Sequence, residues 1–206
     1  MLNPSATNLL PARQERLAPF VAFLAFFMIA LSSQALAADP ESFVSKSQER
    51  LTAARQAPSG GPQRSACSKL VGDTFDLNAI AKASAGQDWN VYSNRLKGKL
   101  AEAIGTRLTG ECLDLLDDRI AGEAVVRRVR QTQGGASVTA QMDNAKAAVF
   151  VWRLRPGGAL GWTAVDLSVD GRGLVATIKA DLASYIRTRN GEIEPAIEDF
   201  ARAGRK

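Results

Sequence analysis

The sequence contains no histidine among its 206 residues. Without an imidazole, neither a Ser-His-Asp nor a Cys-His catalytic arrangement is available, and the commonest zinc ligand is also missing. Only two cysteines are present, and Cys67 and Cys112 are too few and too far apart to form a metal-binding motif. We therefore expect a protein that is not an enzyme, and we assign it no catalytic residue, no metal ligand and no cofactor.

The sequence also lacks a block of charge of one sign. Its 26 Lys and Arg residues and 21 Asp and Glu residues give a net charge of +5, and they are scattered along the chain. A short basic stretch contains Arg127, Arg128 and Arg130, but strand alternation places Arg128 and Arg130 on one face and Arg127 on the other. We therefore expect no nucleic-acid partner.

Long hydrophobic runs are absent except near the N-terminus. Two arginines precede an apolar run over residues 19–31, and a small-x-small cleavage site ends at Ala37. This pattern is typical of exported proteins, so we expect residues 1–37 to be a cleaved signal peptide and residues 38–206 to form a single soluble domain in the periplasm. An uncleaved membrane anchor is the alternative, although the run is shorter than the ~20 residues that span a bilayer.

Export changes the interpretation of the two cysteines. Thiols in an oxidising compartment usually pair, so we expect a disulfide between Cys67 and Cys112. Two unpaired buried thiols are the alternative that the sequence leaves open.

The hydrophobic period changes twice along the mature chain. Helical spacing of apolar residues predicts helices over residues 41–56, 64–71, 74–83, 88–108, 174–186 and 192–203. Short β-branched or aromatic runs separated by turn residues predict four antiparallel strands over residues 124–130, 136–142, 147–154 and 161–169. Residues 57–62 are expected to be a flexible linker. Helices followed by strands and again by helices indicate an α+β fold.

Three charged side chains of the strand region have more than one interpretation. Asp166 lies in an otherwise apolar strand, where a carboxylate needs backbone amides or an arginine as partners, so we expect a structural role for it. The guanidinium groups of Arg153 and Arg155 have a geometry that suits a phosphate group. Solvated arginines at a strand end are the simpler explanation of the same two residues.

Several short motifs occur in a fixed order along the chain. They are Phe75-Asp76-Leu77 with Ile80-Ala81, Gly86-x-x-Trp89, Phe150-x-Trp152-Arg153, Gly161-Trp162, Asp166-x-x-x-x-Gly171, and Asn190-Gly191 before a terminal helix. In this order and spacing, the sequence resembles the MlaC family of periplasmic phospholipid-binding proteins. This toluene-tolerance group includes the hopanoid-associated HpnM type. The resemblance covers about residues 41–203.

The resemblance implies helices packed around a curved antiparallel sheet, which together enclose a hydrophobic cavity for acyl chains. It also implies a protein that shuttles a phospholipid or a hopanoid-like lipid between an outer-membrane lipoprotein complex and an inner-membrane ABC transporter complex. The candidate lipid-binding residues are apolar side chains of the early helix, the third strand and the later helix: Phe75, Leu77, Ile80, Val149, Phe150, Val151, Trp152, Leu174, Ile178 and Leu182.

The residues leave three questions open. Alternation places Phe150 and Trp152 on one face of the third strand and Val149 and Val151 on the other, and both faces are apolar. Periodicity therefore does not say which face lines the cavity. Arg172 stands where the family usually has an apolar residue near the pocket, and it is open whether this charge closes the pocket. The alternative function is a non-catalytic interaction module of the same fold, whose cavity is filled by its own side chains.

Overall fold

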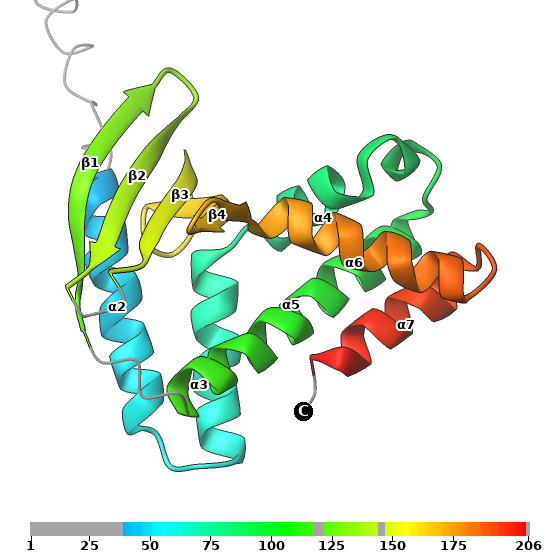
Figure 1. Ribbon diagram of the computed structural model, residues 1–206, viewed down its shortest axis with the longest axis horizontal. Coiled ribbons are helices and arrows are strands. Elements are labelled where there is room, and N and C mark those ends of the chain that lie inside the picture. The colour runs from blue at the N-terminus through cyan, green and yellow to red at the C-terminus, as the bar shows by residue number, and fades with distance from the viewer. Residues whose placement is uncertain (1–38, 118–121, 144–146, 205–206) are drawn as a thin grey trace, which may run out of the picture. The chain divides into compact units, whose positions relative to one another are not determined.

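Three helices open the described part of the chain, and acidic residues cap two of them (Figure 1). The computed structural model describes residues 39–117, 122–143 and 147–204. These first helices are α2 (Pro40–Gln56), α3 (Gly61–Thr74) and α4 (Leu77–Ala85). The Asp39 carboxylate accepts a hydrogen bond from the Glu41 amide at 3.1 Å, and Asp76 accepts one from the Ala79 amide at 2.9 Å. The expected linker is shorter than predicted, because the first turn of α3 already begins at Gly61.

Helix α5 (Asn94–Asp117) begins and ends later than the sequence predicts. The apolar spacing favours one helix over residues 88–108, but a separate 3₁₀ helix, η1 (Gly86–Asn90), occupies the start of that range. Ser93 separates the two elements, because its hydroxyl accepts a hydrogen bond from the Leu96 amide at 3.2 Å, as a helix cap does. The apolar residues at helical spacing within the predicted range therefore come from two elements.

A meander of antiparallel strands follows, and its hydrogen-bonded order is β1-β2-β3-β4-β5. The strands are β1 (Ala124–Thr132), β2 (Gly135–Met142), β3 (Val149–Pro156), β4 (Trp162–Val169) and β5 (Arg172–Gly173). The four strands predicted from the sequence are confirmed, and β5 adds a short fifth one. Trp152 is paired with Val138 and with Leu167, so these three side chains share one face of the sheet, which we call the inner face. Val151 therefore points to the outer face.

The chain ends in two helices, α6 (Leu174–Thr188) and α7 (Ile193–Ala203). The turn between them contains Asn190 and Gly191 with φ angles of 53° and 92°, the left-handed conformation that the Asn-Gly pair predicts. Helix α7 is attached to α5 through Glu194, whose two carboxylate oxygens each lie 2.6 Å from the Arg95 guanidinium. Helix α7 lies beside α5 and α6, on the side of these helices away from the sheet (Figure 1).

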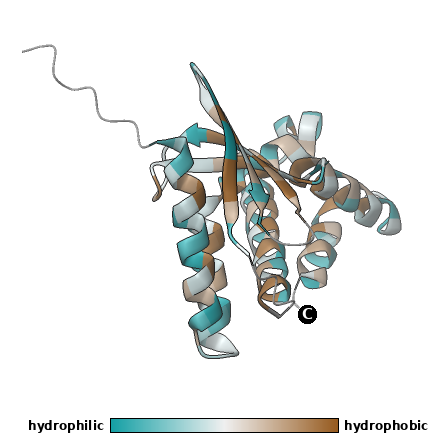
Figure 2. Ribbon diagram, turned by 60° about the vertical axis from the view of Figure 1, so that its left-hand side comes forward, coloured by the Kyte–Doolittle hydropathy of each residue, from teal (hydrophilic) through white to brown (hydrophobic). Residues whose placement is uncertain are grey.

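Buried apolar side chains form three groups, and Figure 2 shows hydrophobic residues along the strands and in the helices beside them. The first group lies among α4, α5, α6 and α7 and includes Ile80, Leu100, Ile104, Ile178 and Phe200. The second lies between α2 and the inner face of the sheet and includes Phe43, Val138, Leu154 and Trp162. The third joins α2, α3 and α5 and contains Ala54, Cys67, Cys112 and Leu116. Helix α2 is therefore held to both the sheet and the helical half of the fold.

The expected signal peptide, residues 1–37, lies outside the described residues. Residues 38–206 form one compact unit, and everything described belongs to it. Within residues 39–117, 122–143 and 147–204, no helix has both the length and the apolar character needed to cross a bilayer.

Candidate ligand-binding cavity

A cavity of about 730 Å³ lies between α2, α3, the end of α5 and the inner face of the sheet. This volume falls in the range of roughly 300–1,000 Å³ that is typical of small-molecule sites. Apolar side chains from all of these elements form much of the wall: Val44, Leu51, Leu70, Val71, Phe75, Leu108, Leu115, Ala124, Met142, Phe150, Trp152 and Leu167. Such a wall favours a ligand that buries hydrocarbon, because each Å² of apolar surface removed from water contributes about 25 cal/mol.

Trp152 forms the part of the wall where α2, the sheet and the junction of α3 with α4 meet. Its ring lies 5.4 Å from that of Phe43 at 74°, and 5.9 Å from that of Phe75 at 35°. Such edge-to-face and tilted contacts stabilise aromatic pairs beyond the burial of their area. Phe75 is itself attached to the sheet, because it forms a bridge with Ala164. The indole is therefore held from two sides and gives the cavity a fixed wall.

Helix α2 contributes one long side of the cavity. Val44 and Leu51 are seven residues apart, so they lie on one face of the helix, and both line the cavity. Gln48, between them, donates a hydrogen bond from Nε2 to the Ala124 carbonyl at 3.3 Å. This bond ties the middle of α2 to the first residue of β1 and holds the two walls together.

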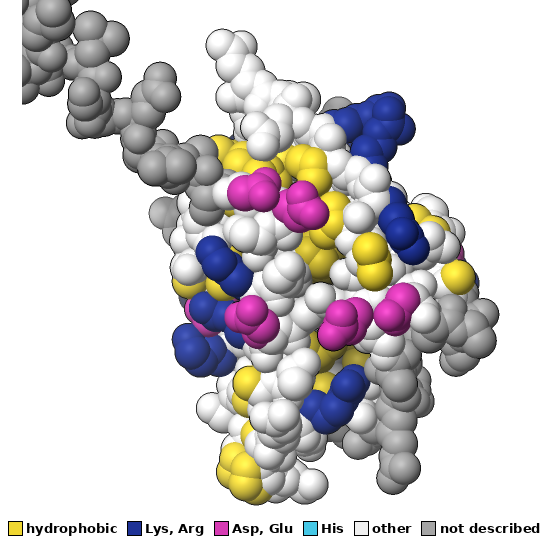
Figure 3. Space-filling model, turned by 90° about the vertical axis from the view of Figure 1, so that its left-hand side faces the viewer, with side chains coloured by type: hydrophobic (Ala, Val, Ile, Leu, Met, Phe, Trp, Pro, Cys, Tyr) yellow, Lys and Arg dark blue, Asp and Glu magenta, His cyan; other side chains and the backbone are white. Residues whose placement is uncertain are grey.

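The cavity opens to solvent at the end of α5 and the start of β1. Leu115, which lines it, is 45% exposed, a high value for a leucine. The exposed residues Glu49, Glu111 and Glu123 also line the cavity. Figure 3, in which the side of α2 and β1 comes forward, shows acidic side chains next to hydrophobic ones, with Lys and Arg side chains on the same face. The opening, which we call the mouth, thus combines apolar and acidic groups.

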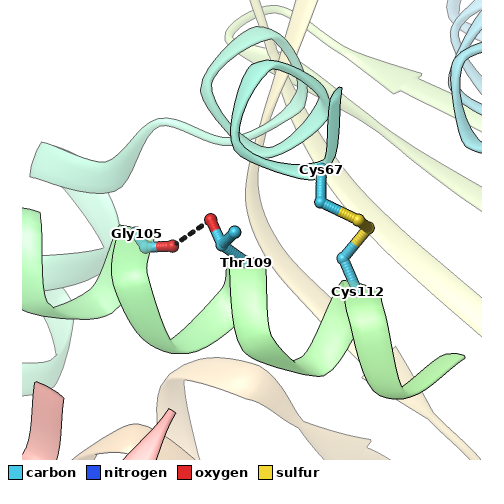
Figure 4. The surroundings of a disulfide bond; sticks show 4 residues. All are labelled: Cys67, Gly105, Thr109 and Cys112. Atoms are coloured by element: carbon cyan, nitrogen blue, oxygen red, sulfur yellow. Dashed lines mark hydrogen bonds between the residues drawn. A yellow bond between two sulfur atoms is a disulfide. The ribbon is translucent and has the colours of Figure 1, made fainter. Parts of the chain in front are cut away.

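A disulfide joins the two helices opposite α2. Cys67 of α3 and Cys112 of α5 are bonded, with their Cα atoms 5.9 Å apart, and Cys112 also lines the cavity (Figure 4). The expected pairing is therefore present in the structure. One turn before Cys112, the Thr109 hydroxyl donates a hydrogen bond to the Gly105 carbonyl at 2.7 Å. The bridge fixes the distance between α3 and α5 at the wall of the cavity.

The structure divides the ten residues predicted to bind lipid into three sets. Those that line the cavity are Phe75, Phe150 and Trp152. Those that belong to the helical core among α4 to α7 are Leu77, Ile80, Leu174, Ile178 and Leu182. Val149 and Val151 point to the outer face of the sheet, where Val149 is 37% exposed. The inner face of β3 is therefore the one that meets the cavity.

Asp166, Arg153 and Arg155 of the strand region are paired within the protein. The Asp166 carboxylate accepts hydrogen bonds from the Leu167 and Val175 amides, each at 3.0 Å, and from Arg153 at 2.5 Å, so its structural role is confirmed. Arg155 forms an ion pair with Asp76. Neither arginine lines the cavity. Arg172 is exposed and also lies outside the cavity wall, so it does not close the pocket.

The sequence did not indicate that α2 and the end of α5 would line the site. Leu51 and Leu115 have the spacing of ordinary core residues, and this spacing does not distinguish a packed core from the wall of a cavity. The predicted helix also ended at residue 108, so the sequence did not indicate that α5 continues to Leu115 and brings this side chain to the cavity wall.

Comparison with known proteins agrees with this architecture. A family model described as MlaC protein matches residues 41–202, most of the chain. The chain belongs to the MlaC family. No curated protein matches the sequence of this MlaC-family protein.

Solved structures share the fold. One of them is that of a phospholipid-binding protein from Ralstonia solanacearum in complex with a phospholipid, and it superposes with a TM-score of 0.66. The match covers 82% of this chain and 100% of that chain, at 15% sequence identity. At this identity the likeness shows the fold alone, and it confirms the α+β arrangement of helices around an antiparallel sheet.

Proposed function

We propose that this MlaC-family protein binds a phospholipid, or a related apolar lipid, in the cavity between α2 and the sheet. It carries the lipid through the periplasm between an outer-membrane lipoprotein complex and an inner-membrane ABC transporter complex, without changing it chemically. The observation that carries the proposal is the cavity of about 730 Å³ with its apolar wall and its mouth open to solvent.

Three further observations support the proposal. The family model covers residues 41–202, and the structurally similar protein from Ralstonia solanacearum is described as phospholipid-binding. The disulfide between Cys67 and Cys112 fits an oxidising compartment such as the periplasm. The sequence contains no histidine, which fits a carrier rather than an enzyme.

The contacts with the lipid follow from the geometry of the wall. Phe75, Phe150 and Trp152 line the cavity from the sheet side, and Leu51 lines it from α2. Acyl chains lie between these two sides, because that position buries the most hydrocarbon. The headgroup lies at the mouth near Leu115, because a buried phosphate without partners would be destabilised by several kcal/mol.

The direct test is the lipid content of the native protein. The protein is isolated from the envelope fraction without detergent, extracted with organic solvent and analysed by mass spectrometry for phospholipids and other apolar lipids. We expect one lipid species or class at about one molecule per chain. A preparation that contains no lipid, and takes none up from phospholipid vesicles, would favour the interaction module and overturn the proposal.

A cavity-filling variant tests the position of the ligand. Leu51→Trp places a larger apolar side chain in the existing space, so we expect bound lipid to be lost while the thermal midpoint is kept. Overpacking a filled core would instead destabilise the protein by about 1–3 kcal/mol. Thr139→Trp is the matched control, because Thr139 lies on the outer face of the sheet, paired with Val151. Equal lipid content in both variants would contradict the assignment of the cavity.

A further inference from the structure

The mouth of the cavity carries an excess of negative charge. Glu49 of α2, Glu111 of α5 and Glu123, next to the start of β1, all line the cavity and are all exposed. They come from α2, from α5 and from the residue just before β1, and they line the same cavity. Asp143 adds a further carboxylate there, because its Oδ1 accepts a hydrogen bond from the Glu123 amide at 2.7 Å.

The described residues that line the cavity include one basic side chain, Arg55, beside the three glutamates, and Arg55 is itself engaged in an interaction. Arg107 lies 3.2 Å from Glu111, but its guanidinium is shared with Asp181 at 2.9 Å. The ion pairs found among the described residues involve neither Glu49 nor Glu123. The mouth is therefore negative in a protein whose net charge is +5.

An independent observation indicates that the cavity is completed by a ligand. Thr74 lines the cavity, is only 2% exposed, and its hydroxyl oxygen has no hydrogen-bond partner within the described residues. An unpartnered buried hydroxyl is destabilising, because it has given up its hydrogen bonds with water. A ligand with a hydrogen-bonding group next to its hydrocarbon would supply the missing partner, and a lipid with ester oxygens has this chemistry.

We infer that the acidic mouth selects lipids whose headgroup carries a cation, such as zwitterionic ethanolamine phospholipids, over anionic ones. This inference rests on the proposed lipid-binding function and names the headgroup class of that site. An ammonium at the mouth is attracted by Glu49 and Glu123, whereas a headgroup with only negative charge is repelled by both. The carboxylates are exposed and screened by solvent, so each contributes little, and together they give roughly threefold to tenfold selection.

Uptake from vesicles that contain both lipids tests the selection. Both lipids are then offered on the same surface, so attraction of the protein to the vesicle does not differ between them. Vesicles contain phosphatidylethanolamine and phosphatidylglycerol in equal amounts with identical acyl chains. Lipid-free protein is incubated with them and separated, and its bound lipids are quantified by mass spectrometry. We expect phosphatidylethanolamine to be enriched about threefold to tenfold over phosphatidylglycerol, although the net positive charge of the protein attracts it to anionic lipids.

Neutral variants identify the source of the selection. In Glu49→Gln/Glu123→Gln the bound ratio should fall to that of the vesicles. Glu102→Gln, an exposed glutamate of α5 outside the cavity wall, should keep the enrichment. Loading of both lipids without enrichment, or enrichment that the double variant keeps, would overturn the inference and leave the proposed function intact. Loading of neither lipid would overturn both.

Discussion

Asp166 ties the sheet to the helix that follows it. Helix α6 has no side-chain cap of its own, because its cap position is Gly173, and the Asp166 carboxylate instead accepts a hydrogen bond from the Val175 amide in the first turn. We expect Asp166→Ala to destabilise the protein by about 2–3 kcal/mol, since two backbone amides lose their acceptor. Urea unfolding of the variant measures the loss.

Two further variants separate the amide bonds of Asp166 from its ion pair. Asp166→Asn keeps an acceptor oxygen, so it should cost less than the alanine variant. Arg153 is 64% exposed, and Arg153→Ala should therefore cost at most about 1 kcal/mol. An equal loss in Arg153→Ala and Asp166→Ala would show that the ion pair, and not the amide bonds, is the main contribution.

The two faces of β3 show which part of the site could be predicted from the sequence and which part could not. Alternation along β3 correctly separated Phe150 and Trp152 from Val149 and Val151, because the period of a strand is fixed by its geometry. It did not identify the inner face, because both pairs are apolar. That choice depends on the contact of Trp152 with Phe43, a residue more than a hundred positions earlier in the chain, which no local pattern contains.

At the scale of the elements, the disulfide is a covalent constraint on the cavity wall. It joins α3 to α5 across a sequence separation of 45 residues. The chain-entropy model gives about 4 kcal/mol for a loop of this size. We expect Cys67→Ala/Cys112→Ala to lose about this much stability and to retain less lipid, because α3 and α5 are no longer fixed at the wall.

Thermal unfolding and lipid content of the double variant measure both effects. Wild-type protein treated with a reductant should lose stability in the same way, which controls for the loss of the two sulfur atoms. A double variant as stable as the oxidised protein would show that the core of Ala54 and Leu116 holds the two helices without the bridge.

The ion pair between Arg95 of α5 and Glu194 of α7 makes the stability of the folded protein depend on pH. Hydrogen bonds from Arg95 and then from Lys99 lower the pKa of Glu194 from 4.5 to about 2. A carboxyl group with a lowered pKa in the folded state contributes stability above its unfolded pKa of 4.5, and this contribution is lost as the pH falls towards 2. We expect the urea midpoint to decline over this interval, and we expect Glu194→Gln to reduce the decline.

Arg95→Ala provides the check on this assignment, because it removes the main cause of the lowered pKa of Glu194. It should reduce the decline in the same direction. Added salt should also weaken the effect, since the Arg95 side chain is 67% exposed. Arg189 and Arg202 lower the pKa of Asp199 to about 2. Part of the decline of the urea midpoint should therefore persist in both variants, because they retain Asp199. A decline unchanged in both would contradict the role of Glu194.

The elements themselves were predictable to different degrees. The four strands were predictable, because short β-branched runs indicate a strand and the turn residues on either side indicate where it begins and ends. The start of α5 was not predictable from spacing. Trp89 and Tyr92 continue the helical spacing, although they precede Ser93 and the helix begins only after it. Apolar spacing locates a buried face, but the cap decides where the helix begins.

At the scale of the whole molecule, charge is arranged differently on the two sides of the sheet. Exposed arginines such as Arg128 and Arg130 lie on β1, an edge strand, where charged side chains oppose pairing with another sheet. Three exposed glutamates, Glu49, Glu111 and Glu123, instead line the cavity. Total charge alone therefore does not describe the surface that a lipid meets.

The last prediction concerns the N-terminus of the mature protein. The run over residues 19–31 is too short to span a bilayer and is followed by a small-x-small site ending at Ala37, so we expect the mature protein to begin at Ala38. Intact mass of the protein from the periplasmic fraction should match residues 38–206, less the two hydrogens lost on forming the disulfide. Ala37→Arg should block cleavage and leave the precursor in the membrane fraction. If the wild type itself keeps Met1 and sits in the membrane, the chain is anchored, and a freely diffusing carrier is excluded.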